Sequence, residues 1–347
     1  MPLPASAIPQ RKQRWLDFLA KSPSSRFVFL IRYAPELGPK PWPNPELKQS
    51  RIEWIWRNYE YHLQRMAWLE DDTIPYLDMI TGTEIFAEAF GCKIYRPDDN
   101  MPFALPCVTS AQEAARLPLP SLDAPSLALA FEMADELRRR AGPEALFRLV
   151  DIQSPMDIAA LIWEKKSFYT ALVEASEAVL ELVEKVRTLL IAFLDEWFRR
   201  YGREFIAHYP DYYMPQGMSL SEDEIGAVSQ RMFIKFFLPE LVELSDRFGG
   251  LGMHCCANSR HQWEYFRNIP NLRLLNINQP EPILREAYPY FADYVPQWHY
   301  GWDPGIHAKE WFIQLPSNAH VVFDVSADSK DQAFTLSEQL TQLRLLL

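Results

Sequence analysis

Hydrophobic positions along the chain follow two different spacings. Short runs of β-branched and aromatic residues recur, and between them apolar residues stand three or four apart, as on one face of a helix. The runs predict strands at 26–33, 73–79, 146–151, 251–256, 272–277, 294–299 and 320–325, and one more in the segment EFIAHY around His208. Strands in this number, alternating with helices, are typical of a closed parallel barrel. We therefore predict an α/β fold, a (β/α)8 TIM barrel.

An open doubly wound sheet is the alternative to the barrel. It is disfavoured because no glycine-rich phosphate-binding fingerprint follows the first predicted strand. The proline-rich stretch 93–123 has no long periodic pattern, which predicts an inserted loop after the second strand. No repeat or linker interrupts the chain, so we expect a single domain over residues 1–347.

Two helices are predicted with defined ends. Apolar residues recur from Phe168 to Phe193, and Gly202 is placed to end that helix. A second helix is expected to begin at Ser221, because Glu224 three residues later completes a capping box. Pro239 predicts a kink or a break within it.

Composition and charge exclude several classes of partner. The formal net charge is −11, and no Lys/Arg run is longer than three residues, so nucleic acid is not expected as a partner. Neither a secretory signal nor an apolar run of membrane-spanning length is present in the sequence. The spacing of the 4 cysteines does not predict a disulfide framework. We expect a cytoplasmic protein with no membrane contact.

Polar residues collect at the predicted strand ends, which form the active face of such barrels. The candidates are Arg32, Asp78, Asp151, His208, Asp211, His254, Cys256, Asn278, Gln279, His299 and Asp324. His208 with Asp211 would suit a metal site or an acid–base pair. A loop made rigid by prolines is the structural alternative for that pair.

The stretch GLGMHCCANSRHQW holds the strongest chemical signal. Side chains two apart on a strand share a face, so His254 and Cys256 point the same way and Cys255 points into the core. An imidazole and a thiolate in this arrangement supply half of a zinc site. Ordinary buried cysteines and a Cys/His nucleophile pair remain open as alternatives.

The same segment, extended to SLSEDEIGAVSQRMFIKFFLPELVELSDRFGGLGMHCCANSRHQWEYFRNIPNLRLLNINQP, resembles the uroporphyrinogen decarboxylase superfamily. It is most similar to the cobalamin-dependent methyltransferase branch, whose strand ends in H-x-C-G-N; this chain reads His254-Cys255-Cys256-Ala257-Asn258. The resemblance implies a (β/α)8 barrel and zinc on His254 and Cys256. It further implies that the zinc lowers the pKa of a substrate thiol, which attacks a methyl group carried on a corrinoid.

The chain departs from that branch at the third zinc ligand. The branch uses a later cysteine, and here none follows Cys256. We predict His299 as the third ligand, because a long side chain from the seventh strand can cross the barrel interior. Asp324, His208 and Asp211 are further candidates. Asn258 and Gln279 are predicted to contact the substrate.

The decarboxylase branch is also similar at particular positions. FVFLIRYAPELG resembles its first-strand motif, which implies that Arg32 binds a substrate carboxylate, although the motif's second arginine falls on Glu36. PYLDMITGTEIFAEAFGCKI resembles its second-strand motif, in which Asp78 matches the aspartate that holds pyrrole NH groups. The late histidine motif is missing. One matched arginine argues against a substrate with many carboxylates.

Three functions follow, in order of preference. The first is a zinc-dependent methyltransferase that exchanges a methyl group with a corrinoid protein. The alternatives are a decarboxylase of uroporphyrinogen or another multi-carboxylate substrate, and a non-catalytic ligand-binding member. Asp78 and Asp211 are the predicted catalytic acids, and Arg32 and His208 the predicted substrate contacts. A small-molecule substrate is expected, and a homodimer remains open.

Overall fold

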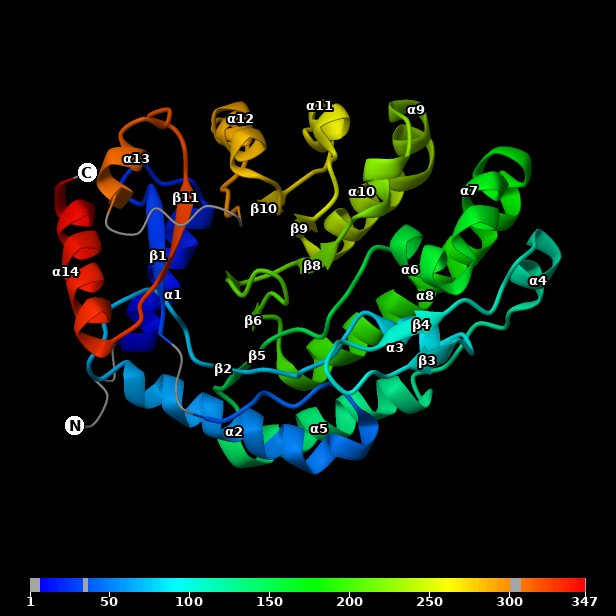
Figure 1. Cartoon of the computed structure of the whole chain (residues 1–347), viewed down its shortest axis with the longest axis horizontal. Helices are drawn as coiled ribbons and strands as arrows, with labels where there is room; N and C mark the ends of the chain where they lie inside the picture. Colours follow the sequence, from blue (N-terminus) through cyan, green and yellow to red (C-terminus); the bar gives the residue numbers. More distant parts are fainter. Residues whose placement is uncertain (1–6, 34–36, 300–306, 347) are drawn as a thin grey trace.

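The computed structural model describes residues 7–33, 37–299 and 307–346 (Figure 1). Its strands are β1 Phe27–Arg32, β2 Tyr76–Leu77, β3 Lys93–Tyr95, β4 Phe103–Leu105, β5 Leu146–Phe147, β6 Phe205–Ile206, β7 Tyr213–Met214, β8 Met218–Ser221, β9 Leu251–Cys255, β10 Leu272–Ile277 and β11 Val321–Ser326. Its α-helices are α1 Ala7–Leu19, α2 Lys48–Arg65, α3 Glu84–Ala89, α4 Ala111–Arg116, α5 Pro125–Ala141, α6 Pro155–Ile162, α7 Lys165–Glu174, α8 Ser176–Tyr201, α9 Gln230–Met232, α10 Leu238–Phe248, α11 Trp263–Phe266, α12 Glu281–Phe291, α13 Ala308–Phe312 and α14 Lys330–Leu346.

The strands form short ladders that are mostly parallel. β1 pairs with β11, β8 and β10 flank β9, and β2 pairs with β5, all in parallel. Single parallel bridges continue this order from β5 to β6, from Gln153 to Ser221, and through Gln297 from β10 to β11. β3–β4 and β6–β7 are antiparallel. The prediction of an α/β fold is thus confirmed, because helices alternate with mainly parallel strands. The sheets that these strands form are small.

Helices cover the outside of this arrangement. Figure 1 shows β1 and β11 at the left of the view beside α14, β8, β9 and β10 in its upper middle, and α2 and α5 along its lower edge. The apolar runs explain the layering, since every residue of β9 is buried, as a strand covered on both faces must be. α8 buries one face, from Val179 to Phe198. Its C-terminal end at Gly202 was predicted, and Gly202 has a positive φ of 93° there. No helix in the described ranges is both long and apolar enough to cross a membrane.

Three local predictions were wrong. The helix predicted from Phe168 to Gly202 is two helices, because α7 ends at Glu174 and α8 begins at Ser176, with the non-helical Ala175 between them. Ser221 ends β8 instead of capping a helix, and α9 begins only at Gln230, where the Ser229 side chain accepts the Met232 N–H. The same residue spacing that forms a capping box also fits a strand end followed by a turn. The predicted strand at 294–299 is reduced to a bridge at Gln297. Pro296 has no N–H to give to a ladder. The break expected at Pro239 is present. A π-helical stretch, Phe233–Phe237, ends directly before α10, which begins at Leu238.

The proline-rich stretch 93–123 has more structure than a loop. It contains the antiparallel pair β3–β4, in which Tyr95 faces Phe103, followed by the short helix α4. The strands are too short to produce a visible alternation over several residues, which is why the pattern did not reveal them.

Candidate metal centre

The ends of two neighbouring strands bring three ligand-type side chains together. β8 runs parallel to β9 with Ser221 opposite His254. Asp223 lies two residues beyond the end of β8, and Cys256 directly follows β9. One ligand atom each from Asp223, His254 and Cys256 lies within 4.8 Å of the other two. His254 and Cys256 were predicted from the sequence, and Asp223 was not.

A buried amide fixes the orientation of the His254 ring. Asn276, on β10 opposite His254, is fully buried, and its Oδ1 is hydrogen-bonded to His254 Nδ1. The Asn276 amide group donates to the Trp298 carbonyl, so its oxygen must face the histidine and accept from it. His254 therefore carries its proton on Nδ1 and presents the Nε2 lone pair. A partner of this kind is what orients metal-binding histidines.

Cys256 is exposed, and its backbone is held at both ends. Its N–H donates to Asp223 Oδ1 at 2.6 Å, and its carbonyl accepts from Gln279 Nε2 at 2.7 Å. Partial burial, together with the Asp223 carboxylate, raises the pKa of the Cys256 thiol to about 12. The thiol is therefore protonated near neutral pH unless a cation binds there.

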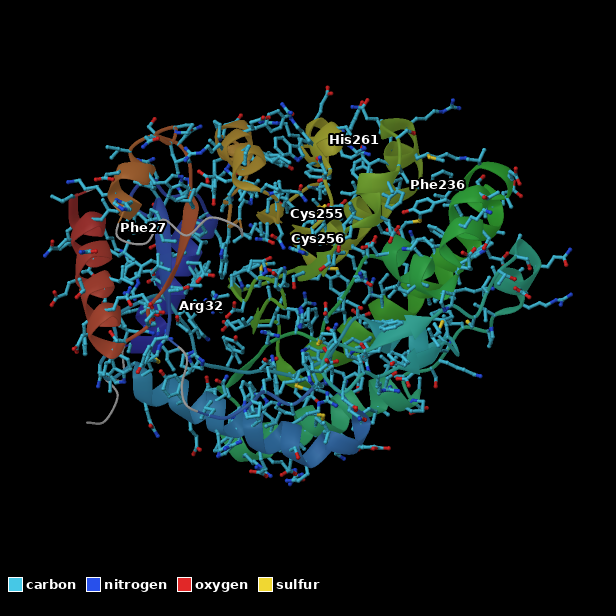
Figure 2. The ribbon with its side chains drawn as sticks, viewed as in Figure 1. Phe27, Arg32, Phe236, Cys255, Cys256 and His261 are labelled. Carbon is cyan, nitrogen blue, oxygen red and sulfur yellow. The ribbon has the colours of Figure 1, made fainter. Side chains whose placement is uncertain are left out.

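Cys255 differs from its neighbour as the strand alternation predicts. It is fully buried, and its Sγ lies 3.4 Å from Ser259 Oγ. Burial raises the pKa of this thiol as well. Figure 2 shows both cysteines near the middle of the view, at the end of β9, with Arg32 on β1 to their left.

The chemistry of the donor set fits zinc. One imidazole nitrogen, one thiolate sulfur and one carboxylate oxygen are all zinc ligands, and three protein ligands leave a fourth position for a substrate. The Tyr209 and His254 rings make a T-shaped contact, with ring centroids 4.5 Å apart. This contact shields one side of the histidine.

The prediction of His299 as the third ligand is corrected by the geometry. His299 is buried, its Nδ1 accepts the Ile277 N–H at 3.0 Å, and its Nε2 lies 3.0 Å from Gln297 Oε1. Both ring nitrogens are therefore occupied, and the ring packs against Tyr288 instead of joining His254 and Cys256. Burial lowers the pKa of His299 to about 3, so it is a neutral core residue.

Arg32 and Asp211 belong to one ion-pair cluster. The Arg32 guanidinium donates two hydrogen bonds of 2.8 Å to Asp211 and two more, of 2.7 and 3.3 Å, to Asp324. Tyr76 also donates to Asp211, at 2.9 Å. Burial works to raise the pKa of Asp211, but the Arg32 charge and its hydrogen bonds outweigh this and lower it to about 2. The predicted catalytic acid Asp211 is thus placed as a permanent anion that anchors Arg32, and it is a poor proton acceptor.

Asp78 and His208 belong to a second cluster. Asp78 lies 2.7 Å from Lys40 Nζ and 3.2 Å from Arg148 Nε, so although burial opposes ionisation its pKa is lowered. Arg148 also lies 3.2 Å from His208 Nε2, and His208 Nδ1 lies 3.2 Å from Asp151. The predicted residues Asp78 and His208 are thus joined through an arginine. Asp78 is likewise an ion-paired anion.

The remaining predicted contacts lie at the edge of the metal centre. Gln279 reaches the Cys256 carbonyl, so it supports the backbone of the site. Asn258 is exposed, and its Oδ1 accepts the Arg260 N–H at 3.4 Å. Asn258 therefore shapes the turn after β9.

Three buried acids lie behind Asp223, and one of them, Asp157, holds its backbone. Asp157, on α6, accepts the N–H groups of Asp223 and Glu224 at 2.7 and 3.0 Å. Burial raises the pKa of Asp157 to about 7, and Glu222 and Glu240 nearby are also buried with raised pKa values. Asp157 thus fixes the loop that presents the Asp223 carboxylate.

Sequence reasoning missed Asp223, Asn276 and Arg148. A signal existed for two of them, because Asn276 and Arg148 are polar residues inside apolar strand runs. Such positions require a partner, and a buried polar side chain on an inner strand indicates a site. Asp223 was hidden because its segment was interpreted as the first turn of a helix.

Comparisons with known proteins agree with this fold. A family profile described as uroporphyrinogen decarboxylase (URO-D) matches residues 71–291. A solved structure, a methyltransferase from Methanosarcina mazei, superposes with a TM-score of 0.66 and 14% sequence identity, covering 96% of this chain and 98% of that chain. A search among curated proteins finds no match. At this identity the structural similarity concerns the fold alone.

Proposed function

Because the chain belongs to the uroporphyrinogen decarboxylase family, we propose that it is a metal-dependent methyltransferase that exchanges a methyl group with a corrinoid carried by a partner protein. We also propose that its parallel strands form the (β/α)8 barrel of one domain. The observation that carries the function is the group of Asp223, His254 and Cys256, with Asn276 fixing the free nitrogen of the histidine. Asp223 takes the place that a third cysteine would hold in the related branch.

Each residue of the centre has a defined task in this proposal. Asp223, His254 and Cys256 hold the ion, and a zinc ion bound there would lower the pKa of a substrate thiol so that it is a nucleophile at neutral pH. Asn276 keeps the His254 lone pair directed at the centre. Gln279 and the Asp223 carboxylate fix the backbone of Cys256.

The charge around the strand ends favours this proposal over decarboxylation of a polyacid. Binding many carboxylates requires cations that are not already neutralised. Here Arg32 is paired with two aspartates, and Lys40 and Arg148 share Asp78. The described cations near the site are thus balanced by acids, which suits a neutral or zwitterionic thiol better than uroporphyrinogen.

Metal analysis tests the ligand set. Protein purified without chelator and reconstituted with zinc is expected to bind one ion per chain. The variants Asp223→Ala, His254→Ala and Cys256→Ala are each expected to lose most of it. His299→Ala is the matched control, because it removes a buried histidine outside the centre. Retention of zinc in the Asp223→Ala variant, or its loss in His299→Ala, contradicts the ligand set.

Methyl transfer tests the reaction. Methylcobalamin serves as the donor, and a panel of small thiols serves as acceptors. Zinc-dependent formation of a methyl thioether and of demethylated cobalamin is expected, and it should be absent in Cys256→Ala. Loss of carboxylate groups from uroporphyrinogen under anaerobic conditions would instead favour the decarboxylase. Binding of cobalamin or a thiol, with no turnover of either kind, would favour a non-catalytic binding protein.

A further inference from the structure

The other two cysteines of the chain lie together, outside the metal centre. Cys92 directly precedes β3, and Cys107 lies two residues beyond β4. Their Sγ atoms are 3.4 Å apart. Because β3 and β4 pair with each other, the two thiols lie at the open end of this hairpin. Two cysteines 15 residues apart in sequence are thereby brought within reach of a covalent bond.

The backbone on both sides holds the two sulfurs in place. The Cys92 N–H donates to the Ala87 carbonyl of α3 at 3.2 Å, and the Cys107 N–H donates to the Ile162 carbonyl of α6 at 2.9 Å. Cys107 Sγ also lies 4.0 Å from the Phe90 carbonyl. The approach of the thiols therefore follows from two anchored strand ends, and it does not depend on one long side chain.

We propose that Cys92 and Cys107 form a reversible disulfide that closes the base of the β3–β4 hairpin. The oxidant is a small-molecule disulfide such as glutathione disulfide. The Cys107 thiolate attacks it, releases one thiol and forms a mixed disulfide. Cys92 then loses its proton and attacks the Cys107 sulfur, which releases the second thiol. Two cysteine thiols are oxidised, and one small disulfide is reduced to two thiols.

Exposure favours Cys107 as the thiol that reacts first. Cys107 is exposed and Cys92 is buried, so an external disulfide reaches Cys107. The hydrogen bond from Cys92 also lowers the pKa of Cys107 to about 7. Cys255 is fully buried. Cys107 thus combines exposure with a second thiol 3.4 Å away, which favours this pair among the 4 cysteines for oxidation.

The bond would fix a hairpin with an exposed apolar surface. Tyr95, Phe103 and Leu105 are between 43% and 53% exposed, and the rings of Tyr95 and Phe103 are in contact. Met101, in the turn of the hairpin, packs over Gly82 in the loop that follows Asp78. Closing the base limits how far these residues can move away from that loop.

Peptide mapping of the full-length protein tests the proposal. Trypsin cleavage after Lys93 separates the cysteines into peptides 66–93 and 94–116, because Arg96 is followed by proline and is not cut. After incubation with excess glutathione disulfide and acid quenching, the two peptides are expected to be joined until a reductant is added. The peptide that contains Cys255 and Cys256 is expected to remain largely unmodified.

Single variants distinguish the pathway. Cys92→Ser is expected to stop at a glutathione adduct on Cys107, and Cys107→Ser is expected to react little. Oxidation should raise the melting temperature of the wild type and leave that of both variants unchanged. The proposal is overturned if the wild type carries a glutathione adduct on Cys107 without the cross-link, or if neither product forms. None of these outcomes depends on metal binding or methyl transfer.

Discussion

Replacing Asn276 with alanine removes the side chain that orients His254. Asn276 is fully buried, and both ends of its amide are used, by His254 Nδ1 and by the Trp298 carbonyl. The substitution leaves two buried polar groups without partners, each costing ~1–3 kcal/mol, so the metal-free protein should lose ~2–6 kcal/mol of unfolding free energy. Zinc affinity should fall by ~10–100-fold, because the histidine is no longer held in one tautomer.

Gln297→Ala is the matched control for this experiment. Gln297 is also fully buried, and it contacts His299 Nε2 and donates to the Tyr288 carbonyl at 3.0 Å. Its removal should cost a similar unfolding free energy and leave zinc affinity unchanged. The two quantities are separable, since urea unfolding in the presence of chelator gives the stability and competition with a chromophoric chelator gives the affinity. Equal losses of affinity in both variants would refute the role assigned to Asn276.

Three further predictions follow from particular contacts. The pKa of Asp211 is about 2 in the folded protein, below its ordinary value of 3.8. The ion pair with Arg32 therefore stabilises the fold fully above about pH 4. This contribution of ~2 kcal/mol is lost as the pH falls through about 2. Asp211→Asn should remove that part of the pH dependence of urea unfolding, and an unchanged slope would contradict the ion pair. In Gly252→Ala the new Cβ would lie 1.6 Å from the hydroxyl oxygen of buried Tyr212. The free energy of unfolding should therefore fall by at least ~1–3 kcal/mol. An unchanged urea midpoint would instead show that β9 can shift to make room for the methyl group. A chelator should lower the melting temperature of the zinc-loaded wild type, since an ion at 100 times its Kd contributes ~2.7 kcal/mol, and should leave Cys256→Ala unaffected.

The sequence was informative where one local rule decides the outcome. The apolar runs at 26–33, 251–256 and 272–277 became β1, β9 and β10 because each is buried on both faces. The alternation rule also placed Cys255 in the core and left Cys256 exposed. The resemblance to the uroporphyrinogen decarboxylase superfamily is confirmed by the match over residues 71–291.

The third ligand could not be obtained in this way, because it depends on pairing between strands. His299 was chosen for the reach of its side chain, yet a neighbouring backbone N–H and Gln297 take both of its nitrogens. Asp223 reaches the centre because β8 pairs with β9 in a register that no local pattern in 218–224 reveals. A motif of two ligand-type residues indicates a candidate metal site, but the identity of the third ligand is a property of the tertiary structure.

The mixed donor set of the proposed metal centre has a consequence for metal selectivity. Sulfur favours soft ions and a carboxylate oxygen favours hard ones, so a group of one thiolate, one imidazole and one carboxylate is less selective than a group with two thiolates. Its two anionic donors would leave no net charge with any divalent ion. Iron(II) and cobalt(II) can therefore compete with zinc for such a centre. Which ion occupies it would then be decided largely by the concentrations of available metals in the cell.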